Sequence, residues 1–297
     1  MSSSARRSCT NVALAILVCA AGSSAAPVVA VQADDARIYV TVVGAGGNPV
    51  PRLTAADFSV RENGVEKRIL GAELSTAPMS VELLTDRLGK SPEFTADQMR
   101  AGLMAIVRTL LSVNAETTIS LRTFDSEAVQ HVKPTSSLVQ LENVIRKFFT
   151  NSGNSVLLDA LADAGEDLQK APNAHRLVIA LVAGYKGDSS TITSLAAAQR
   201  LRQSGASFWA LEAVATGVSN PNRDVMLNQA TRDSGGMHAT VSAGTAIEAT
   251  ATRLAVLALA QYEIRYGAPS RTSNRRVDVA VSTAGVQVLA PHWAPDR

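Results

Sequence analysis

Between residues 79 and 261 the sequence alternates short apolar strands with amphipathic helices, and this alternation constrains the fold more than any other feature. Apolar residues recur at helical spacing in segments such as 95–111, whereas residues 175–184, "HRLVIALVAG", form a continuous apolar run. Strands that are apolar throughout and separated by helices form mostly parallel sheets with helices on both faces. The pattern therefore predicts a doubly wound α/β domain over residues 77–258. The expected strands are 80–86, 117–125, 175–184 and 206–214, and the expected helices are 95–111, 137–149, 154–170, 193–205, 223–236 and 244–261.

Both flanks of this region have the sequence character of β-structure. Residues 37–43 and 261–267 alternate apolar and polar side chains, and Asn63-Gly64 is typical of a two-residue hairpin turn. Neither flank has enough apolar residues for a core of its own, and each alone would leave strand edges exposed. We therefore predict that residues 36–76 and 259–292 pair with each other in one discontinuous β domain, into which the α/β domain is inserted.

The first 33 residues are typical of an export signal. A pair of arginines precedes an apolar run, and Val31-Gln32-Ala33 fits a signal-peptidase site, so we predict cleavage after Ala33. The mature protein would be secreted or periplasmic, without a membrane span. An uncleaved N-terminal membrane anchor is the alternative, because no charged residue interrupts residues 8–33. Both cysteines, Cys9 and Cys19, lie in this segment, so the mature chain would contain no thiol, disulfide or thiolate metal site.

The composition of the mature chain argues against nucleic-acid binding and against several enzyme classes. Two of the 28 Lys and Arg residues precede residue 34, which leaves 26 against 26 Asp and Glu residues. Such a neutral balance gives no electrostatic footprint for nucleic acid. The sequence has no G-x-S-x-G elbow, and its histidines are scattered without ligand spacing. We therefore expect neither enzymatic activity nor a cofactor. The four histidines are His131, His175, His238 and His292.

Several motifs in order resemble the bacterial von Willebrand factor A-related proteins, over roughly residues 36–293. The segment "PVPRLTAADFSVRENGVEKRI" is similar to the leading β segment of that family, and "GNSVLLDAL" to its G-G-T-x-L-Y-D-A-L turn. The segment "RLVIALVAGYKGDSS" is similar to its R-K-x-x-V-L-L-T-D-G strand and loop, and "QYEIRYGAPS" to its Q-Y-x-L-x-Y-x-P strand. The resemblance implies an A-type α/β fold.

The resemblance also implies a place for a metal-ion-dependent adhesion site. In A-type domains this site takes D-x-S-x-S from one loop, a threonine from a second and an aspartate from a third, all oxygen ligands suited to Mg²⁺ or Mn²⁺. Asp86 matches the first aspartate, but Leu88 and Lys90 replace both serines. Ser155 replaces the threonine, and Ala183 replaces the third-loop aspartate. We therefore expect a degenerate site that holds no metal, in which the Lys90 ammonium would repel a cation or pair with Asp86.

The function that we infer from these features is an exported, non-enzymatic binding module for a protein or envelope ligand. Binding would use the rim, which we define as the loops that begin near Asp86, Ser155 and Ala183, because ligands of open α/β sheets bind at the carboxyl edge of the strands. Two alternatives stay open: an accessory protein that joins an assembly through its β strands, and metal-dependent adhesion with Ser91 or Asp188 as substitute ligands. Glu82, inside an apolar strand, either pairs with a buried arginine or marks a sheet edge. The candidate rim residues are Asp86, Lys90, Ser91, Ser155 and Asp188.

Overall fold

A computed structural model of the chain describes residues 35–87, 94–148, 154–183, 187–214, 221–267 and 274–294. All of these residues belong to one compact unit. The expected export signal, residues 1–33, lies outside the described residues. Within the described part of the chain, no helix is long and apolar enough to cross a membrane.

A six-stranded sheet forms the centre of the α/β part, in the order β10-β9-β8-β5-β6-β7. All neighbouring strands pair in parallel except β7, which runs antiparallel to β6 at one edge. The two central strands, β5 and β8, are buried along almost their whole length, as their apolar sequences predicted. The strands are β5 (Met79–Thr85), β6 (Thr118–Phe124), β7 (Ala128–Thr135), β8 (His175–Ala183), β9 (Ser207–Ala213) and β10 (His238–Val241).

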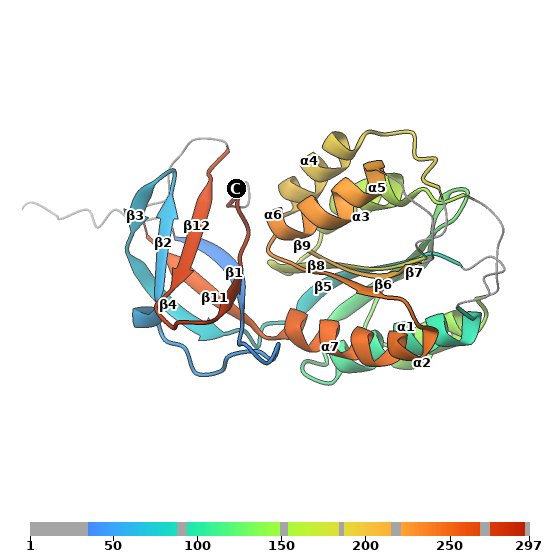
Figure 1. Cartoon of the computed structure of the whole chain (residues 1–297), viewed down its shortest axis with the longest axis horizontal. Coiled ribbons are helices and arrows are strands. Elements are labelled where there is room, and N and C mark those ends of the chain that lie inside the picture. The colour runs from blue at the N-terminus through green and yellow to red at the C-terminus, as the bar shows by residue number, and fades with distance from the viewer. Residues whose placement is uncertain are drawn as a thin grey trace, which may run out of the picture. The chain divides into compact units, whose positions relative to one another are not determined.

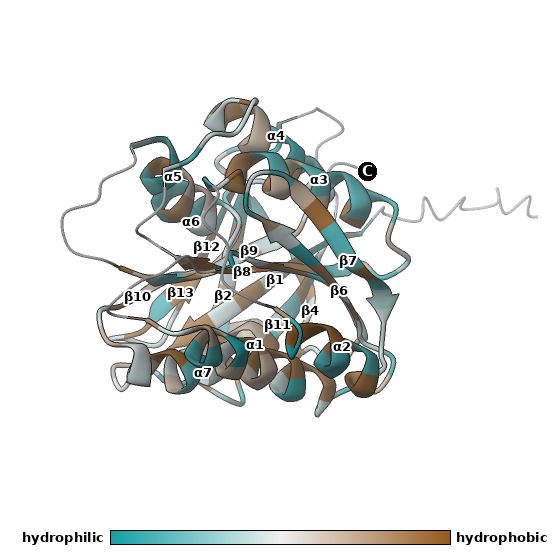
Figure 2. Ribbon diagram, turned by 90° about the vertical axis from the view of Figure 1, so that its right-hand side faces the viewer, coloured by the Kyte–Doolittle hydropathy of each residue, from teal (hydrophilic) through white to brown (hydrophobic). Residues whose placement is uncertain are grey.

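Helices cover both faces of this sheet (Figure 1). One face packs against α1 (Ala96–Leu111), α2 (Leu138–Ile145) and α7 (Ile247–Leu259), with η3 (Gly244–Ala246) leading into α7. The other face packs against α3 (Leu157–Gln169) and α4 (Ser194–Ser204) and against a broken helix that follows β9. Apolar residues gather on the strands and on the inward sides of the helices (Figure 2). The doubly wound α/β fold is therefore confirmed.

The flanks of the chain pair with each other, as predicted. Strand β1 lies between β11 and β13 in a four-stranded sheet with the order β13-β1-β11-β4, and β2 lies between β12 and β3 in a second sheet. Asn63 and Gly64, with φ angles of 50° and 79°, form the turn between β2 and β3. The bounds that we gave to the separate domains stay a prediction. The strands are β1 (Ala36–Val43), β2 (Phe58–Glu62), β3 (Val65–Lys67), β4 (Ile69–Leu74), β11 (Gln261–Tyr266), β12 (Val277–Val281) and β13 (Gln287–Leu289), with η1 (Ala55–Asp57) before β2.

The helix expected over residues 223–236 is broken into three short pieces, which corrects that prediction. They are α5 (Pro221–Val225), the π-helix η2 (Met226–Ala230) and α6 (Thr231–Asp233). Side chains in this segment bond to backbone carbonyls one turn away: Asn228 Nδ2 donates to Asp224 O at 2.8 Å, and Thr231 Oγ1 donates to Leu227 O at 2.6 Å. Such bonds compete with the regular helical pattern and accompany local widening.

A buried polar contact joins the β strands to the start of the α/β sheet. The ring of Tyr39, on β1, stacks on His175, the first residue of β8, with 4.0 Å between centroids. His175 Nε2 lies 2.6 Å from Gln261 Oε1 on β11. Burial lowers the pKa of His175 to about 4, so the ring is neutral at pH 7.

Candidate functional site

The structure brings Ser155 and Asp188 together at the carboxyl edge of the six-stranded sheet. They form an isolated parallel bridge, in which Ser155 N donates to Gly187 O at 2.9 Å and Ser189 N donates to Ser155 O at 2.7 Å. Asp86 lies at the same edge, directly after β5, where its backbone N–H donates to Leu181 O of β8 at 3.1 Å. Two of the three chain segments of the expected rim are thus tied by backbone hydrogen bonds, and the third is tied to the central strand. The other predicted rim residues, Lys90 and Ser91, and the replaced position Leu88, lie outside the described residues.

Asp188 caps the first turn of α3. Its Oδ2 accepts from the backbone N–H of Leu157 at 3.1 Å, and its Oδ1 accepts from Ser190 N at 3.0 Å. Ser190 Oγ accepts from the backbone N–H groups of Leu158 and Asp159 in the same turn, at 3.0 and 3.3 Å. The first N–H groups of a helix have no intrahelical acceptors, and side-chain oxygens here supply them. Residues 188–190 therefore fasten the loop after β8 onto α3.

An ion pair that the sequence analysis missed lies beside Asp86. Arg87 donates twice to Asp125, from its backbone N–H at 3.0 Å and from Nε at 2.5 Å. The Asp125 side chain is only 3% exposed, whereas Arg87 is 32% exposed. Burial, followed by the nearby charge of Arg87, lowers the pKa of His131. The sequence signal for this pair was Asp125, an acidic residue that directly follows the buried strand β6, the neighbour of β5.

The described residues do not fit a divalent cation at this edge. The third-loop position is Ala183, which brings no oxygen side chain, and both Asp188 oxygens accept from backbone amides. The Arg87 guanidinium, which pairs with Asp125, adds a positive charge at the same edge of the sheet. The Ser155 hydroxyl is buried without a hydrogen-bond partner in the described part of the chain, but one hydroxyl beside Asp86 supplies too few oxygen ligands for Mg²⁺ or Mn²⁺. In those residues no cluster of three or more His, Cys, Asp or Glu side chains is arranged to hold a metal ion.

Glu82 belongs to a buried network and not to the rim. Its strand, β5, lies between β8 and β6, so Glu82 is central, and of our two readings the pairing with a buried arginine is the one observed. Arg122 Nε lies 3.8 Å from Glu82 Oε2, and the Ser120 hydroxyl donates to Glu82 Oε1. Arg122 also pairs with Asp163 at 3.3 Å and with Asp167 at 2.7 Å, both on α3. Burial raises the pKa of Glu82 to about 7, against the opposing effects of Ser120 and Arg122.

A second polar cluster ties the π-helix to the end of β9. Glu212 Oε2 lies 3.0 Å from His238 Nε2, and Glu212 Oε1 lies 3.4 Å from the buried Arg223 guanidinium. The other ring nitrogen of His238 lies 3.2 Å from Asn228 Oδ1 on η2. These contacts join an acid, an arginine, a histidine and an amide, and none of them brings a hydroxyl that the histidine would activate. They hold η2 against the sheet.

Comparison with known proteins agrees with the fold. No family profile matches the sequence, and no curated protein matches it. A solved von Willebrand factor type A structure from Catenulispora acidiphila is similar over 90% of this chain and 76% of its own, with 11% identity and a TM-score of 0.50. Proximal thread matrix protein 1 from the mussel byssus, solved with a zinc-occupied MIDAS motif, is similar over 65% of this chain, with 17% identity and a TM-score of 0.51. The similarity spans about half (48%) of that byssus protein.

Proposed function

We propose, from a fold of the von Willebrand factor A type, that this chain is an exported, non-enzymatic binding module for a protein or envelope ligand. The ligand would bind at the rim, where the open α/β sheet ends. The observation that carries the proposal is the fastening of the rim segments. Asp188 and Ser190 hold the loop after β8 onto α3, and Asp125 holds Arg87 in place. A surface fixed before binding loses less conformational entropy when it meets a partner.

Binding at this rim would not need a metal ion. The support is chemical: Ala183 brings no ligand oxygen, and the carboxylate of Asp188 already accepts two backbone N–H groups. Metal-dependent adhesion through Asp188 would therefore place a cation on a carboxylate that already accepts one backbone N–H at each oxygen. Arg87 and Asp188, which are partly exposed, would instead recognise a partner by direct hydrogen bonds and shape, together with the exposed Asn154 and Ser189.

The absence of enzymatic activity and the exported location belong to the same proposal. At the carboxyl edge, the acids of the described clusters pair with arginines and backbone amides. These pairs position loops, and none of them activates a nucleophile. The N-terminal sequence supports export, with secretion or a periplasmic location after cleavage, and the balanced charge of the mature chain opposes nucleic-acid binding.

A second candidate function is assembly through the β strands. Strands β3 and β4 each lie at the edge of a sheet, and both carry exposed apolar side chains. Val65 on β3 is 60% exposed, and Leu70 and Leu74 on β4 are 40% and 48% exposed. An unpaired edge with apolar side chains is a template for a further strand.

Affinity capture from envelope extracts, with the mature chain as bait and EDTA present, separates the two candidates. The rim variant carries Asn154→Arg and Ser189→Arg, and the matched edge variant carries Val65→Arg and Leu74→Arg; all four positions are exposed. We expect the rim variant to lose the captured partner and the edge variant to keep it. Loss with the edge variant alone would favour assembly through β strands, and retention by both variants would contradict the rim proposal.

A further inference from the structure

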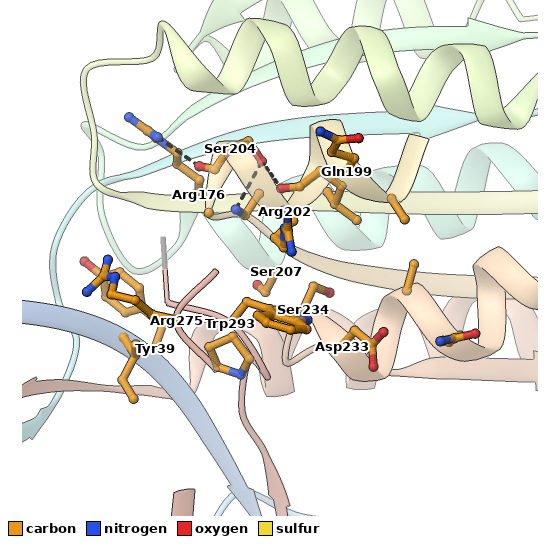
Figure 3. A pocket seen from close by; sticks show the side chains of 18 of the residues that line it. Tyr39, Arg176, Gln199, Arg202, Ser204, Ser207, Asp233, Ser234, Arg275 and Trp293 are labelled. Carbon is orange, nitrogen blue, oxygen red and sulfur yellow. Dashed lines mark hydrogen bonds between the residues drawn. The ribbon is translucent and has the colours of Figure 1, made fainter. Parts of the chain in front are cut away.

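A cavity of about 640 Å³ lies at the end of the α/β sheet opposite to the rim. Its walls come from the starts of β8 and β9, from α4 and η2, from β1 and from the C-terminal segment 291–293 (Figure 3). Arg176 lines this cavity and Ala183 ends the same strand, so seven residues, or roughly 23 Å at about 3.3 Å per residue, separate the two ends. The volume lies in the range of small-molecule sites.

Backbone contacts fix the C-terminal wall of this cavity against the α/β part. Pro291 forms an antiparallel bridge with Ser234, and His292 N donates to Asp233 O at 2.8 Å. Ser234 Oγ accepts in turn from Phe208 N of β9 at 2.9 Å. The segment that carries Trp293 is therefore hydrogen-bonded to Asp233 and Ser234, which also line the cavity.

The described lining carries four arginines and two aspartates. Two of the arginines have carboxylate partners: Arg37 pairs with Glu263 at 3.1 Å, and Arg275 pairs with Glu62 at 3.4 Å. The other two, Arg176 and Arg202, make no salt bridge within the described part of the chain. The acidic side chains of the lining are Asp35 and Asp233, and the latter lies 3.0 Å from the His292 ring.

Arg176 is a fixed cation. Its three nitrogens donate to the backbone carbonyls of Asn173, Ser204 and Ala171 at 3.0, 2.9 and 3.2 Å. Neutral carbonyls orient the guanidinium without cancelling its charge, and burial lowers the pKa of Arg176. Figure 3 shows this side chain pointing away from Arg202 and toward the backbone of Ser204, so Arg176 fixes the wall of the cavity.

Arg202 presents its charge beside an aromatic surface. Its guanidinium carbon lies 5.1 Å from the ring centroid of Trp293, and Figure 3 shows the side chain above that ring. Apolar side chains continue the wall: Met226 of the π-helix is buried, and Leu195 of α4 is 77% exposed. An exposed leucine next to a cavity gives it an apolar mouth, and π-helices occur frequently at functional sites.

We propose that this cavity binds a small amphipathic carboxylate, one with an aliphatic or aromatic body. The carboxylate pairs with Arg202, because a planar guanidinium group matches a carboxylate with two parallel hydrogen bonds. The apolar body lies against Trp293, Met226 and Leu195. This site is separate from the rim and does not depend on the function proposed there.

The test uses the mature full-length chain and a pair of fluorescent probes. Anilinonaphthalene sulfonate is an amphipathic anion, and N-phenyl-1-naphthylamine is its uncharged analogue. We expect saturable binding of the anionic probe, stronger than that of the neutral one. Decanoate should displace the anionic probe, whereas decanol at the same concentration should not. Equal displacement by decanol, or no displacement by decanoate, would overturn the proposal.

Two variants assign the binding to the cavity. Arg202→Gln should weaken decanoate affinity by about tenfold, because it removes the charge-assisted contact to the carboxylate. Arg200→Gln is the matched control: it lies on the same helix, pairs with Glu166 at 2.7 Å outside the cavity, and should bind decanoate like the wild type. Ala198→Phe, which fills the cavity, should abolish displacement. Unchanged decanoate affinity in both Arg202→Gln and Ala198→Phe, with circular dichroism showing folded protein, would refute the site.

Discussion

The replacement Glu82→Gln tests whether a buried carboxylate makes the stability of this protein depend on pH. Glu82 is 2% exposed in the central strand β5, and burial raises its pKa to about 7 from an ordinary 4.5. Glutamine keeps the shape of the side chain and an oxygen that accepts from Ser120. Arg122 keeps its contacts with Asp163 and Asp167, so the replacement leaves no buried cation without a partner.

The sign of the effect follows from proton linkage. Between pH 4.5 and 7 the folded chain binds the Glu82 proton and the unfolded chain releases it, so the free energy of unfolding falls as pH rises. A shift of about 2.5 pKa units at about 1.4 kcal/mol per unit gives roughly 3 kcal/mol by pH 8. Glutamine does not titrate. The variant should therefore gain roughly 3 kcal/mol relative to the wild type between pH 4.5 and pH 8.

Urea unfolding at pH 4.5, 6 and 8, followed by circular dichroism, measures this difference. Val65→Ala, at an exposed residue without a charge, is the control and should show a pH-independent difference from the wild type. If Glu82→Gln also differed from the wild type by the same amount at every pH, the raised pKa of Glu82 would be refuted, since this carboxyl group would then ionise normally in the folded chain.

Three other predictions concern separate parts of the chain. Because His175 is neutral in the folded state, with a pKa of about 4 against 6.5 unfolded, stability should fall by up to roughly 3 kcal/mol as pH drops from 7 to 4. Urea unfolding of His175→Gln should lack this slope, and an unchanged slope would contradict the buried neutral ring. Millimolar Mg²⁺ or Mn²⁺ should not raise the Tm of the wild type, whereas Leu88→Ser with Lys90→Ser and Ala183→Asp should gain EDTA-reversible stabilisation, about 2.7 kcal/mol at one hundred times Kd. An EDTA-reversible shift in the wild type would revive metal-dependent adhesion. N-terminal sequencing of protein from the envelope fraction should begin at Asp34, and an intact Met1 in membranes would establish an anchor.

The parts of the fold that were predictable from sequence are those encoded by local pattern. The continuous apolar run of β8 required burial on both faces, and the helical spacing in residues 95–111 specified α1 to within a residue. The Asn63-Gly64 pair specified the turn between β2 and β3 because it tolerates positive φ at both positions. The pairing of the two flanks followed from their lack of a separate core. Neither β7 nor β10 was predicted: β7 is an edge strand with a proline, and β10 has only four residues.

The contacts of the candidate sites depend on which strands become neighbours, and local pattern does not contain that information. Glu82 meets Ser120 because β5 and β6 pair in a register that places these two residues opposite each other. Arg87 reaches Asp125 for the same reason: each lies two residues beyond the last paired positions of these strands, Thr85 and Thr123. The cavity near Arg176 is assembled from β1, α4, η2 and the C-terminal segment, which are far apart in the sequence.

Site-specific photocrosslinking tests whether a partner binds at the rim without a metal ion. A photoreactive phenylalanine derivative replaces either Asn154 at the rim or Val65 at the β3 edge, both exposed, and each protein is irradiated in envelope extract containing EDTA. Metal-independent binding at the rim should give a specific crosslinked species with the probe at residue 154 and none with the probe at residue 65. A crosslink at residue 65 alone, or one at residue 154 that appears only when Mg²⁺ replaces EDTA, would contradict it.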